Sequence, residues 1–207
     1  ILRIIKMKYI FLKNFLDKFV AILALIFLFP LFLIIITSSF FILGLPIFFI
    51  QKRPGFKGKI FKLIKFRTMK QAKNNQINPI EDRIRETKYG NFLRSISFDE
   101  LPEIINIVKG EMSFVGPRPL LEEYLDLYSA EELKRHNVKP GITGYAQING
   151  RNSISWKKKF EYDLWYIKNL SFANDIKIIF NTIKKVIQRK NINQSKNISM
   201  PKFKGSN

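Results

Sequence analysis

The 207-residue sequence contains no cysteine and only one histidine, His136. Without thiols the chain can form no disulfide, no thiolate nucleophile and no cysteine-ligated metal site. A single histidine also argues against a histidine-rich zinc site or a serine–histidine dyad. Because His136 follows Lys134 and Arg135, we expect an exposed helix residue rather than a catalyst. Catalytic chemistry, if present, would depend on carboxylates, basic side chains and a hard cation.

Acidic residues are scarce as well. The 16 Asp and Glu residues face 36 Lys and Arg residues, which leaves a net charge of +20. Such a surplus predicts anionic partners, which can be nucleic acid, lipid headgroups or phosphorylated substrates, and charge alone does not choose among them. The length suits one domain with room for an appendage.

Charged residues are missing altogether from residues 19–50, a run of 32 residues. This run is long enough for a membrane helix and too long for a cleaved signal peptide. Basic residues flank it on both sides: Arg3, Lys6, Lys8, Lys13 and Lys18 precede it, and Lys52, Arg53, Lys57, Lys59 and Lys62 follow it. The positive-inside rule assigns both ends to the cytoplasm, whereas two full crossings would need about 40 residues and a turn. We therefore favour a re-entrant helix that breaks at Pro30 over a single tilted anchor helix.

The remaining residues predict a small, mainly helical α+β domain. Two β-prone runs, 47–51 and 59–66, flank a turn at 52–55 and predict a hairpin. Residues 71–89 read as a long polar surface loop. Helical patterns follow at 101–109, 120–128, 130–137, 156–168 and 172–190. The last pattern is amphipathic, and packing of its apolar face on the core is favoured over contact with lipid.

This pattern divides the chain into three parts. Residues 1–50 form a basic segment and the membrane helix, residues 51–190 form the cytoplasmic domain, and residues 191–207 form a polar tail that we expect to be mobile.

The stretch SFDELPEI carries two adjacent carboxylates, Asp99 and Glu100, just before Pro102. A helix that begins here, with Asp99 as its N-cap, explains the proline and both acids. Two loops further along carry arginine among proline and glycine. Arg118 lies between two prolines in the loop 116–119, and Arg151 ends the glycine-containing loop 140–151. Such loops suit phosphate binding, although each alone is equally typical of an ordinary turn.

Three motifs in order carry a more specific signal: KIFKLIKFRTM (59–69), RSISFDELPEIINIVKGEMSFVGPRPL (94–120) and RHNVKPGITGYAQINGRNSISWKKKFEYD (135–163). With them the chain resembles the bacterial sugar transferases of the small monotopic phosphoglycosyl transferase family, from about residue 13 to residue 190. Within that family it is most similar to enzymes that act on diacetylbacillosamine in protein N-glycosylation.

The resemblance implies an enzyme of the bacterial inner membrane with its catalytic domain on the cytoplasmic face. Such an enzyme moves a sugar 1-phosphate from a UDP-sugar to undecaprenyl phosphate, with Mg²⁺, and releases UMP. By the same resemblance Asp99 matches the nucleophile, which forms an aspartyl phosphosugar, and Glu100 matches its acidic neighbour. Both are expected near the metal, and the sequence leaves open whether Glu100 binds metal or moves a proton. The matching phosphate-binding bases are Lys65, Arg94, Arg118 and Arg151, and Pro30 matches the helix break.

A second hypothesis is a membrane-anchored basic protein that binds anionic lipid or nucleic acid without catalysis. The three ordered motifs argue against it, as does the lack of a recognisable nucleic-acid-binding motif. We therefore expect a UDP-sugar, a polyprenyl phosphate and an anionic lipid surface as partners, and no nucleic acid.

Overall fold

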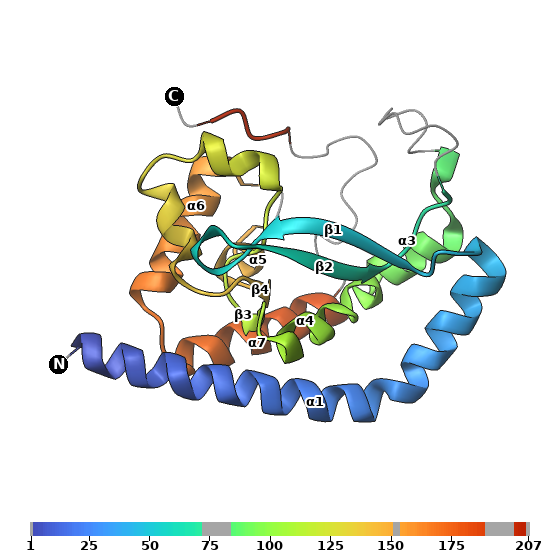
Figure 1. Cartoon of the computed structure of the whole chain (residues 1–207), viewed down its shortest axis with the longest axis horizontal. Coiled ribbons are helices and arrows are strands. Elements are labelled where there is room, and N and C mark those ends of the chain that lie inside the picture. Colours follow the sequence, from blue (N-terminus) through green and yellow to red (C-terminus); the bar gives the residue numbers. More distant parts are fainter. Residues whose placement is uncertain (1, 72–83, 151–153, 189–200, 206–207) are drawn as a thin grey trace.

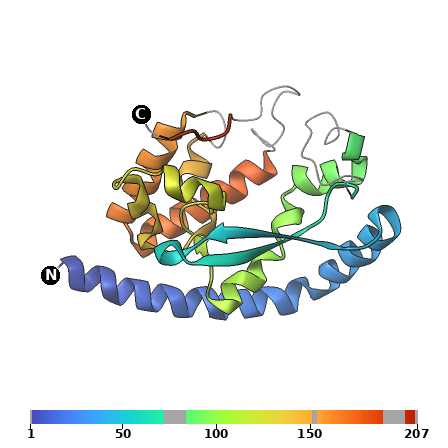
Figure 2. The ribbon, with the colours of Figure 1, turned by 45° about the horizontal axis from the view of Figure 1, so that its top comes forward.

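The structure is a computed structural model that describes residues 2–71, 84–150, 154–188 and 201–205. A single long helix, α1 (Leu2–Leu43), runs along one side of the molecule, and the other labelled helices and strands lie on its concave side (Figures 1 and 2). The other helices are α3 (Lys88–Ser95), α4 (Glu103–Lys109), α5 (Tyr145–Ile148), α6 (Trp156–Lys168) and α7 (Phe172–Ile187). The strands are β1 (Phe48–Pro54), β2 (Ile60–Phe66), β3 (Ser113–Val115) and β4 (Gly141–Thr143). The predicted mainly helical α+β architecture with a small hairpin is confirmed.

Helix α1 is long and apolar enough to span a membrane. Pro30 lies inside it, and the helix continues on both sides of the proline while its axis curves toward β1 (Figure 1). One face packs on the domain through the buried side chains of Ala21, Phe32 and Ile35. The opposite face exposes large apolar side chains over most of its length: Phe11, Phe15, Phe19, Ile26, Phe27, Phe29, Ile34 and Phe41.

The end of α1 is capped by a side chain from the hairpin. Arg67, directly after β2, donates from Nη2 to the carbonyl oxygens of Leu43 at 2.7 Å and Gly44 at 2.5 Å. A cation at these free carbonyls is favourable because the C-terminus is the negative end of the helix dipole. Gly44 has φ +72°, a conformation that ends the helix at little steric cost.

Strands β1 and β2 pair antiparallel, from Phe48 opposite Phe66 to Pro54 opposite Ile60. The predicted hairpin is therefore confirmed, although its turn lies three residues later than expected. Proline is tolerated at the end of a two-stranded edge, so β1 continues through Pro54. The turn closes with the Gly55 amide donating to the Lys59 carbonyl at 2.8 Å.

A second sheet was not predicted, because its strands, β3 and β4, have only three residues each. They pair in parallel, with Ser113 opposite Gly141 and Val115 opposite Thr143. The backbone is crowded where they meet. A Cβ at Gly116 would lie 2.4 Å from the Lys139 carbonyl oxygen. Glycine is therefore required here for close backbone approach, which brings the two motif loops together.

Several predicted helices differ in the structure. Helix α4 begins at Glu103 with Pro102 as its N-cap residue, and the patterns at 120–128 and 130–137 form 3₁₀ helices, Glu122–Leu127 and Glu132–Asn137. The loop predicted at 71–89 ends earlier, because Thr87 caps α3 by accepting from the Gly90 amide at 3.0 Å. Residues 72–83 of that loop lie outside the described residues.

The prediction of an exposed His136 is wrong. Its side chain packs beside the Tyr128 ring with Nδ1 3.1 Å from the Gly55 carbonyl oxygen, and the residue is only 7% exposed. Burial, together with the charge of Arg135, lowers its pKa to about 4. His136 is thus a neutral structural residue.

The C-terminal residues 201–205 also differ from the expected mobile tail. Phe203 is buried among Tyr124, Tyr128, Trp156 and Phe160. This aromatic cluster holds residues 201–205 against α6.

Candidate active site

The adjacent carboxylates lie in a short 3₁₀ helix, Phe98–Glu100, directly before α4. Asp99 is therefore not the N-cap of a longer helix, as the sequence suggested, because Pro102 takes that position. Ser97, which precedes the pair, has φ +59°, an uncommon conformation for a residue with a side chain. This backbone turn directs the acidic pair toward a cavity of about 580 Å³, which both carboxylates line.

Glu100 binds two of the predicted phosphate-binding bases. Its Oε1 accepts from Lys65 Nζ at 2.7 Å and from Arg118 Nη2 at 2.5 Å. Burial alone would raise the pKa of Glu100, but the nearby charges of Arg118 and Lys65 outweigh burial and hold it well below its usual range. Glu100 therefore stays ionised at neutral pH, and its charge raises the pKa of Arg118 in turn.

A third carboxylate, Glu103, lies beneath this cluster. It is 2% exposed, and its Oε1 is 3.0 Å from Lys65 Nζ. Burial and the charge of Glu100 raise its pKa to about 7. Lys65 is thus held between two acids, with its ammonium group fixed beside the cavity.

Asp99 differs from its neighbour because no described base lies within ion-pair distance of its carboxylate. Burial, followed by the charge of Glu100, raises its pKa, while Lys65 and Arg118 oppose the rise. Asp99 is therefore the member of the pair whose carboxylate is not already engaged by a base.

Asn106 explains how α4 holds the acidic pair beside β2. Fully buried, it donates from Nδ2 to the Lys62 carbonyl at 2.8 Å and accepts on Oδ1 from the Ile64 amide at 3.1 Å. These bonds join α4 to the strand edge next to Lys65. Because Asn106 lies one turn after Glu103, these two hydrogen bonds also fix the position of Glu100 and Glu103 along β2 relative to Lys65.

The Arg118 loop is held from behind by a buried ion pair. Arg135 Nη2 donates to Asp163 Oδ2 at 2.8 Å and to the Arg118 carbonyl at 2.7 Å. Both ion-pair side chains are 2% exposed. The loop backbone is therefore fixed, while the Arg118 side chain remains 41% exposed at the cavity.

The remaining predicted residues are placed as follows. Arg94 lines the same cavity from α3, where it pairs with Glu86 at 3.5 Å and Asn91 at 2.7 Å, so it lies near the cluster without contacting Glu100. Arg151 lies outside the described residues. Pro30 lies in α1 and does not line the cavity.

Sequence reasoning missed several lining residues. Lys159 belongs to a lysine run near the start of α6, where cations oppose the helix dipole, and that misfit was the available signal. Burial lowers its pKa to about 8; the charge of Asp163 opposes this shift, and the charges of Arg118 and Arg135 add to it. Thr143, Thr182 and Lys185 line the cavity from β4 and α7, and only the folded chain brings them there.

The acidic pair fits a magnesium ion only in part. No group of three Asp, Glu, His or Cys side chains that could hold a metal occurs among the described residues. Mg²⁺ is commonly held by one or two carboxylates together with substrate phosphates, however. Asp99 at the cavity fits this arrangement, and Glu100 fits less well because its Oε1 already binds two cations.

The structure thus combines a long apolar helix with a cavity lined by acids and bases. Comparison with known sequences gives the family. The family described as "Bacterial sugar transferase" matches residues 8–189. The chain belongs to this family, and it is an enzyme.

Three relatives illustrate the similarity. The uncharacterized sugar transferase EpsL of Bacillus subtilis is 51% identical over 164 residues, which cover 79% of this chain and 81% of the relative. The exopolysaccharide production protein ExoY of Rhizobium meliloti is 37% identical over 188 residues, 83% of each chain. The UDP-glucose:undecaprenyl-phosphate glucose-1-phosphate transferase of Klebsiella pneumoniae is 44% identical over 182 residues, 83% of this chain and 39% of the longer relative.

Proposed function

We propose that the protein transfers a sugar 1-phosphate from a UDP-sugar to a polyprenyl phosphate such as undecaprenyl phosphate and releases UMP. The observation that carries the proposal is the cavity in which Asp99, which forms no ion pair with a described base, lies beside a Lys65–Glu100–Arg118 cluster. The named activity of the Klebsiella relative supports the same reaction.

In the first step, a carboxylate oxygen of Asp99 attacks the sugar-bearing phosphorus. The bond between this phosphorus and the bridging oxygen breaks, so that UMP leaves and an aspartyl phosphosugar remains. The nucleophile must be ionised, although burial raises its pKa. Lys65 and Arg118 oppose this rise and so favour the ionised carboxylate.

Glu100 serves mainly to organise the bases. A carboxylate whose pKa is held low by two cations is a poor proton donor at neutral pH. Its bonds to Lys65 and Arg118 instead hold both cations where the diphosphate would bind, and fixed cations stabilise the charge of a phosphoryl-transfer transition state. Mg²⁺, held by Asp99 and the substrate phosphates, would reduce repulsion between nucleophile and diphosphate.

In the second step, a phosphate oxygen of the lipid attacks the same phosphorus and displaces Asp99. The acceptor is a membrane lipid, so the site must lie at the bilayer surface. Buried side chains of α1 at Ala21, Phe32 and Ile35 contact the domain along much of the helix. A straight crossing would carry much of this helix away from the domain, whereas a re-entrant helix keeps both halves beside it. This supports the re-entrant topology, with the domain on the cytoplasmic face of the inner membrane.

The reaction is testable with the purified protein in detergent. With Mg²⁺ and a UDP-sugar alone, we expect UMP release to stop after a first turnover. Continued release should require both Mg²⁺ and polyprenyl phosphate. UDP-glucose and UDP-galactose are the first donors to test, because relatives are named for them. UDP-diacetylbacillosamine tests the sugar that the sequence resemblance implies. Absence of UMP with a broad donor panel would contradict the proposal.

The nucleophile is tested by Asp99→Asn, with the exposed Asp126→Asn as the matched control. We expect Asp99→Asn to lower turnover at least about a thousandfold and to abolish a sugar-phosphate adduct detectable by mass spectrometry. The control should retain both. An adduct of full yield in Asp99→Asn would remove Asp99 from this role.

A further inference from the structure

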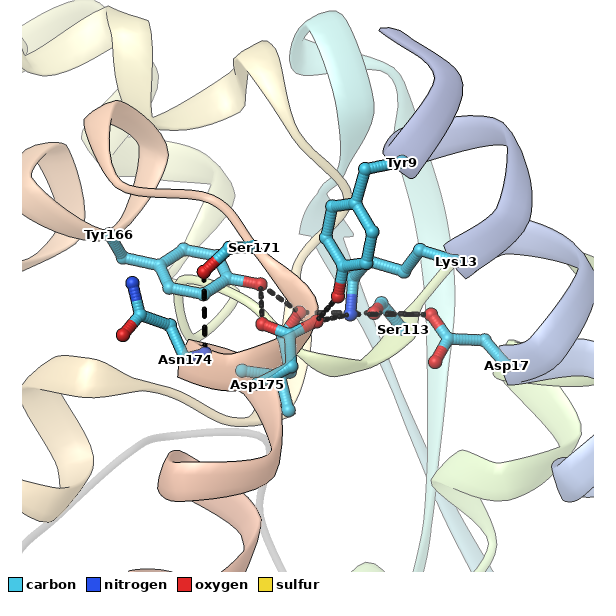
Figure 3. A network of polar contacts seen from close by, with 9 residues as sticks. Tyr9, Lys13, Asp17, Ser113, Tyr166, Ser171, Asn174 and Asp175 are labelled. Carbon is cyan, nitrogen blue, oxygen red and sulfur yellow. Dashed lines mark hydrogen bonds and ion pairs between the residues drawn. The ribbon is translucent and has the colours of Figure 1, made fainter. Parts of the chain in front are cut away.

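A buried polar network joins α1 to the catalytic domain at a distance from the acidic pair (Figure 3). Its centre is Asp175, near the start of α7. Asp175 Oδ2 accepts from Tyr9 Oη at 2.7 Å and from Lys13 Nζ at 2.5 Å, and its Oδ1 accepts from Tyr166 Oη at 2.7 Å. Asp175 is 5% exposed and Tyr166 is 1% exposed. The carboxylate is thus fully satisfied by groups from two different helices, α1 and α6.

A second carboxylate, Asp17, extends the network toward β3. Ser113 Oγ donates to Asp17 Oδ2 at 2.6 Å, and Lys13 Nζ lies 3.6 Å from the same oxygen. Tyr9, Lys13 and Asp17 are spaced four residues apart, so they share one face of α1. In this region α1 contacts the domain through a polar stripe, in contrast to the apolar contacts of its second half.

Two of the hydroxyl groups of the network also face one backbone atom. Tyr166 Oη and Ser113 Oγ each lie 3.0 Å from the Val115 carbonyl oxygen. A hydroxyl carries a single hydrogen, so each must divide it between this carbonyl and a carboxylate, Asp175 or Asp17. The positions of the two carboxylates, which Lys13 bridges, therefore determine where both hydroxyl groups lie beside the Val115 carbonyl.

Val115 directly precedes the turn that carries Arg118. On the far side of that turn, Arg135 holds the Arg118 carbonyl at 2.7 Å. The turn is consequently fixed at both ends, by the buried arginine on one side and by the α1 network on the other.

We propose that Asp175 is a positioning residue for the transferase reaction. It fixes the Tyr166 hydroxyl beside the Val115 carbonyl and joins it to Lys13 and Tyr9 of α1, and so it sets the turn that presents Arg118 to Glu100. The loop that carries Arg118 is therefore ordered only when α1 is packed on the domain. The kinetic part of this inference rests on the proposed function, whereas its structural part does not.

The test uses the full chain and two readouts. Tyr166→Phe removes only the hydroxyl and keeps the buried ring, Asp175→Asn removes the charge, and Lys13→Met removes the bridging cation. Lys18→Met, the same substitution at an exposed position of the same helix, is the matched control. We expect each network variant to lower kcat/KM for the UDP-sugar about tenfold, and the control to leave it unchanged.

A merely structural role would not predict how the effects combine. If Lys13 acts through Asp175 and Tyr166, the double variant Lys13→Met/Tyr166→Phe should lose no more than about the larger single loss. Losses that multiply would overturn the proposal.

The second readout is amide hydrogen exchange without substrate. Exchange in the peptide 113–121 should rise in all three network variants, while exchange in α4 should stay unchanged. If exchange at 113–121 matches the wild type, the inference fails even where the proposed reaction holds. If the wild type releases no UMP, the proposed function fails, and exchange still tests the link between α1 and the loop.

Discussion

At the scale of single residues, the site depends on carboxylates that differ only in their neighbours. Glu100 contacts two cations and has a lowered pKa, whereas Glu103, one turn away and almost fully buried, has a pKa raised to about 7. Lys65 lies between them. One lysine therefore holds an ionised acid at the cavity and an acid beneath it that titrates near neutrality.

This difference predicts a pH-dependent contribution to stability. The folded-state pKa of Glu103 exceeds its ordinary value of 4.5, so its contribution is fully present below pH 4.5 and is lost as pH rises through 7. The loss is on the order of 3 kcal/mol of unfolding free energy. Glu103→Gln cannot titrate. We therefore expect the stability advantage of the wild type over Glu103→Gln to be smaller at pH 8 than at pH 5.5 in thermal unfolding.

The exposed Glu131→Gln provides the control for this measurement, because it should follow the wild type at both pH values. An advantage over Glu103→Gln that stays constant with pH would show that Glu103 does not titrate in this range.

At this scale the sequence singled out residues that the fold brings to one cavity. Lys65, Asp99, Glu100, Arg94 and Arg118 were all singled out, and all line one cavity. The buried His136 was missed because its charged neighbours in the sequence suggested exposure. Its side chain is instead covered by residues distant in the sequence, among them Gly55.

At the scale of elements, α7 shows two apolar surfaces rather than one. Ile178 is buried against the core, as the sequence predicted. A second stripe is exposed and consists of Phe172, Ile176, Phe180, Ile183 and Ile187. The helical period identifies apolar residues but not which of them the core covers, so the contact with lipid that the sequence disfavoured becomes the better explanation of this stripe.

A spin label can test this stripe, since the chain has no native cysteine. We expect a label on Phe180→Cys in reconstituted bilayers to be relaxed more by lipid-soluble oxygen than by a water-soluble nickel chelate. A label on Lys177→Cys, on an exposed polar position of the same helix, should give the opposite order. Equal accessibility at the two positions would mean that α7 does not rest on lipid.

At the scale of the whole molecule, α1 and the catalytic domain form one packed unit. The helix contacts the domain through the network around Asp175, through Ala21 and through Phe32 and Ile35. Its other face is apolar and exposed. A net charge of +20 would additionally favour an anionic membrane surface.

The re-entrant topology predicts the sidedness of both ends of α1. Single cysteines at Lys8 and Lys57, both exposed, should react with a membrane-impermeant maleimide from the same side of inverted membrane vesicles. A cysteine at Phe27, in the apolar run, should be shielded from both sides. Reaction of the two end positions from opposite sides would establish a spanning helix instead.

The sequence by itself determined the local features. Its 32-residue uncharged run, its paired carboxylates and its ordered motifs were sufficient for the long apolar helix, the acidic pair and the family, because these properties depend on neighbours along the chain. Only the tertiary structure showed that Lys65 and Arg118 contact Glu100 and that Glu103 lies beneath Lys65. It also placed Asp175 and Tyr166 between α1 and the Val115 carbonyl. These contacts join residues up to 166 positions apart, so they cannot be predicted from patterns of neighbouring residues.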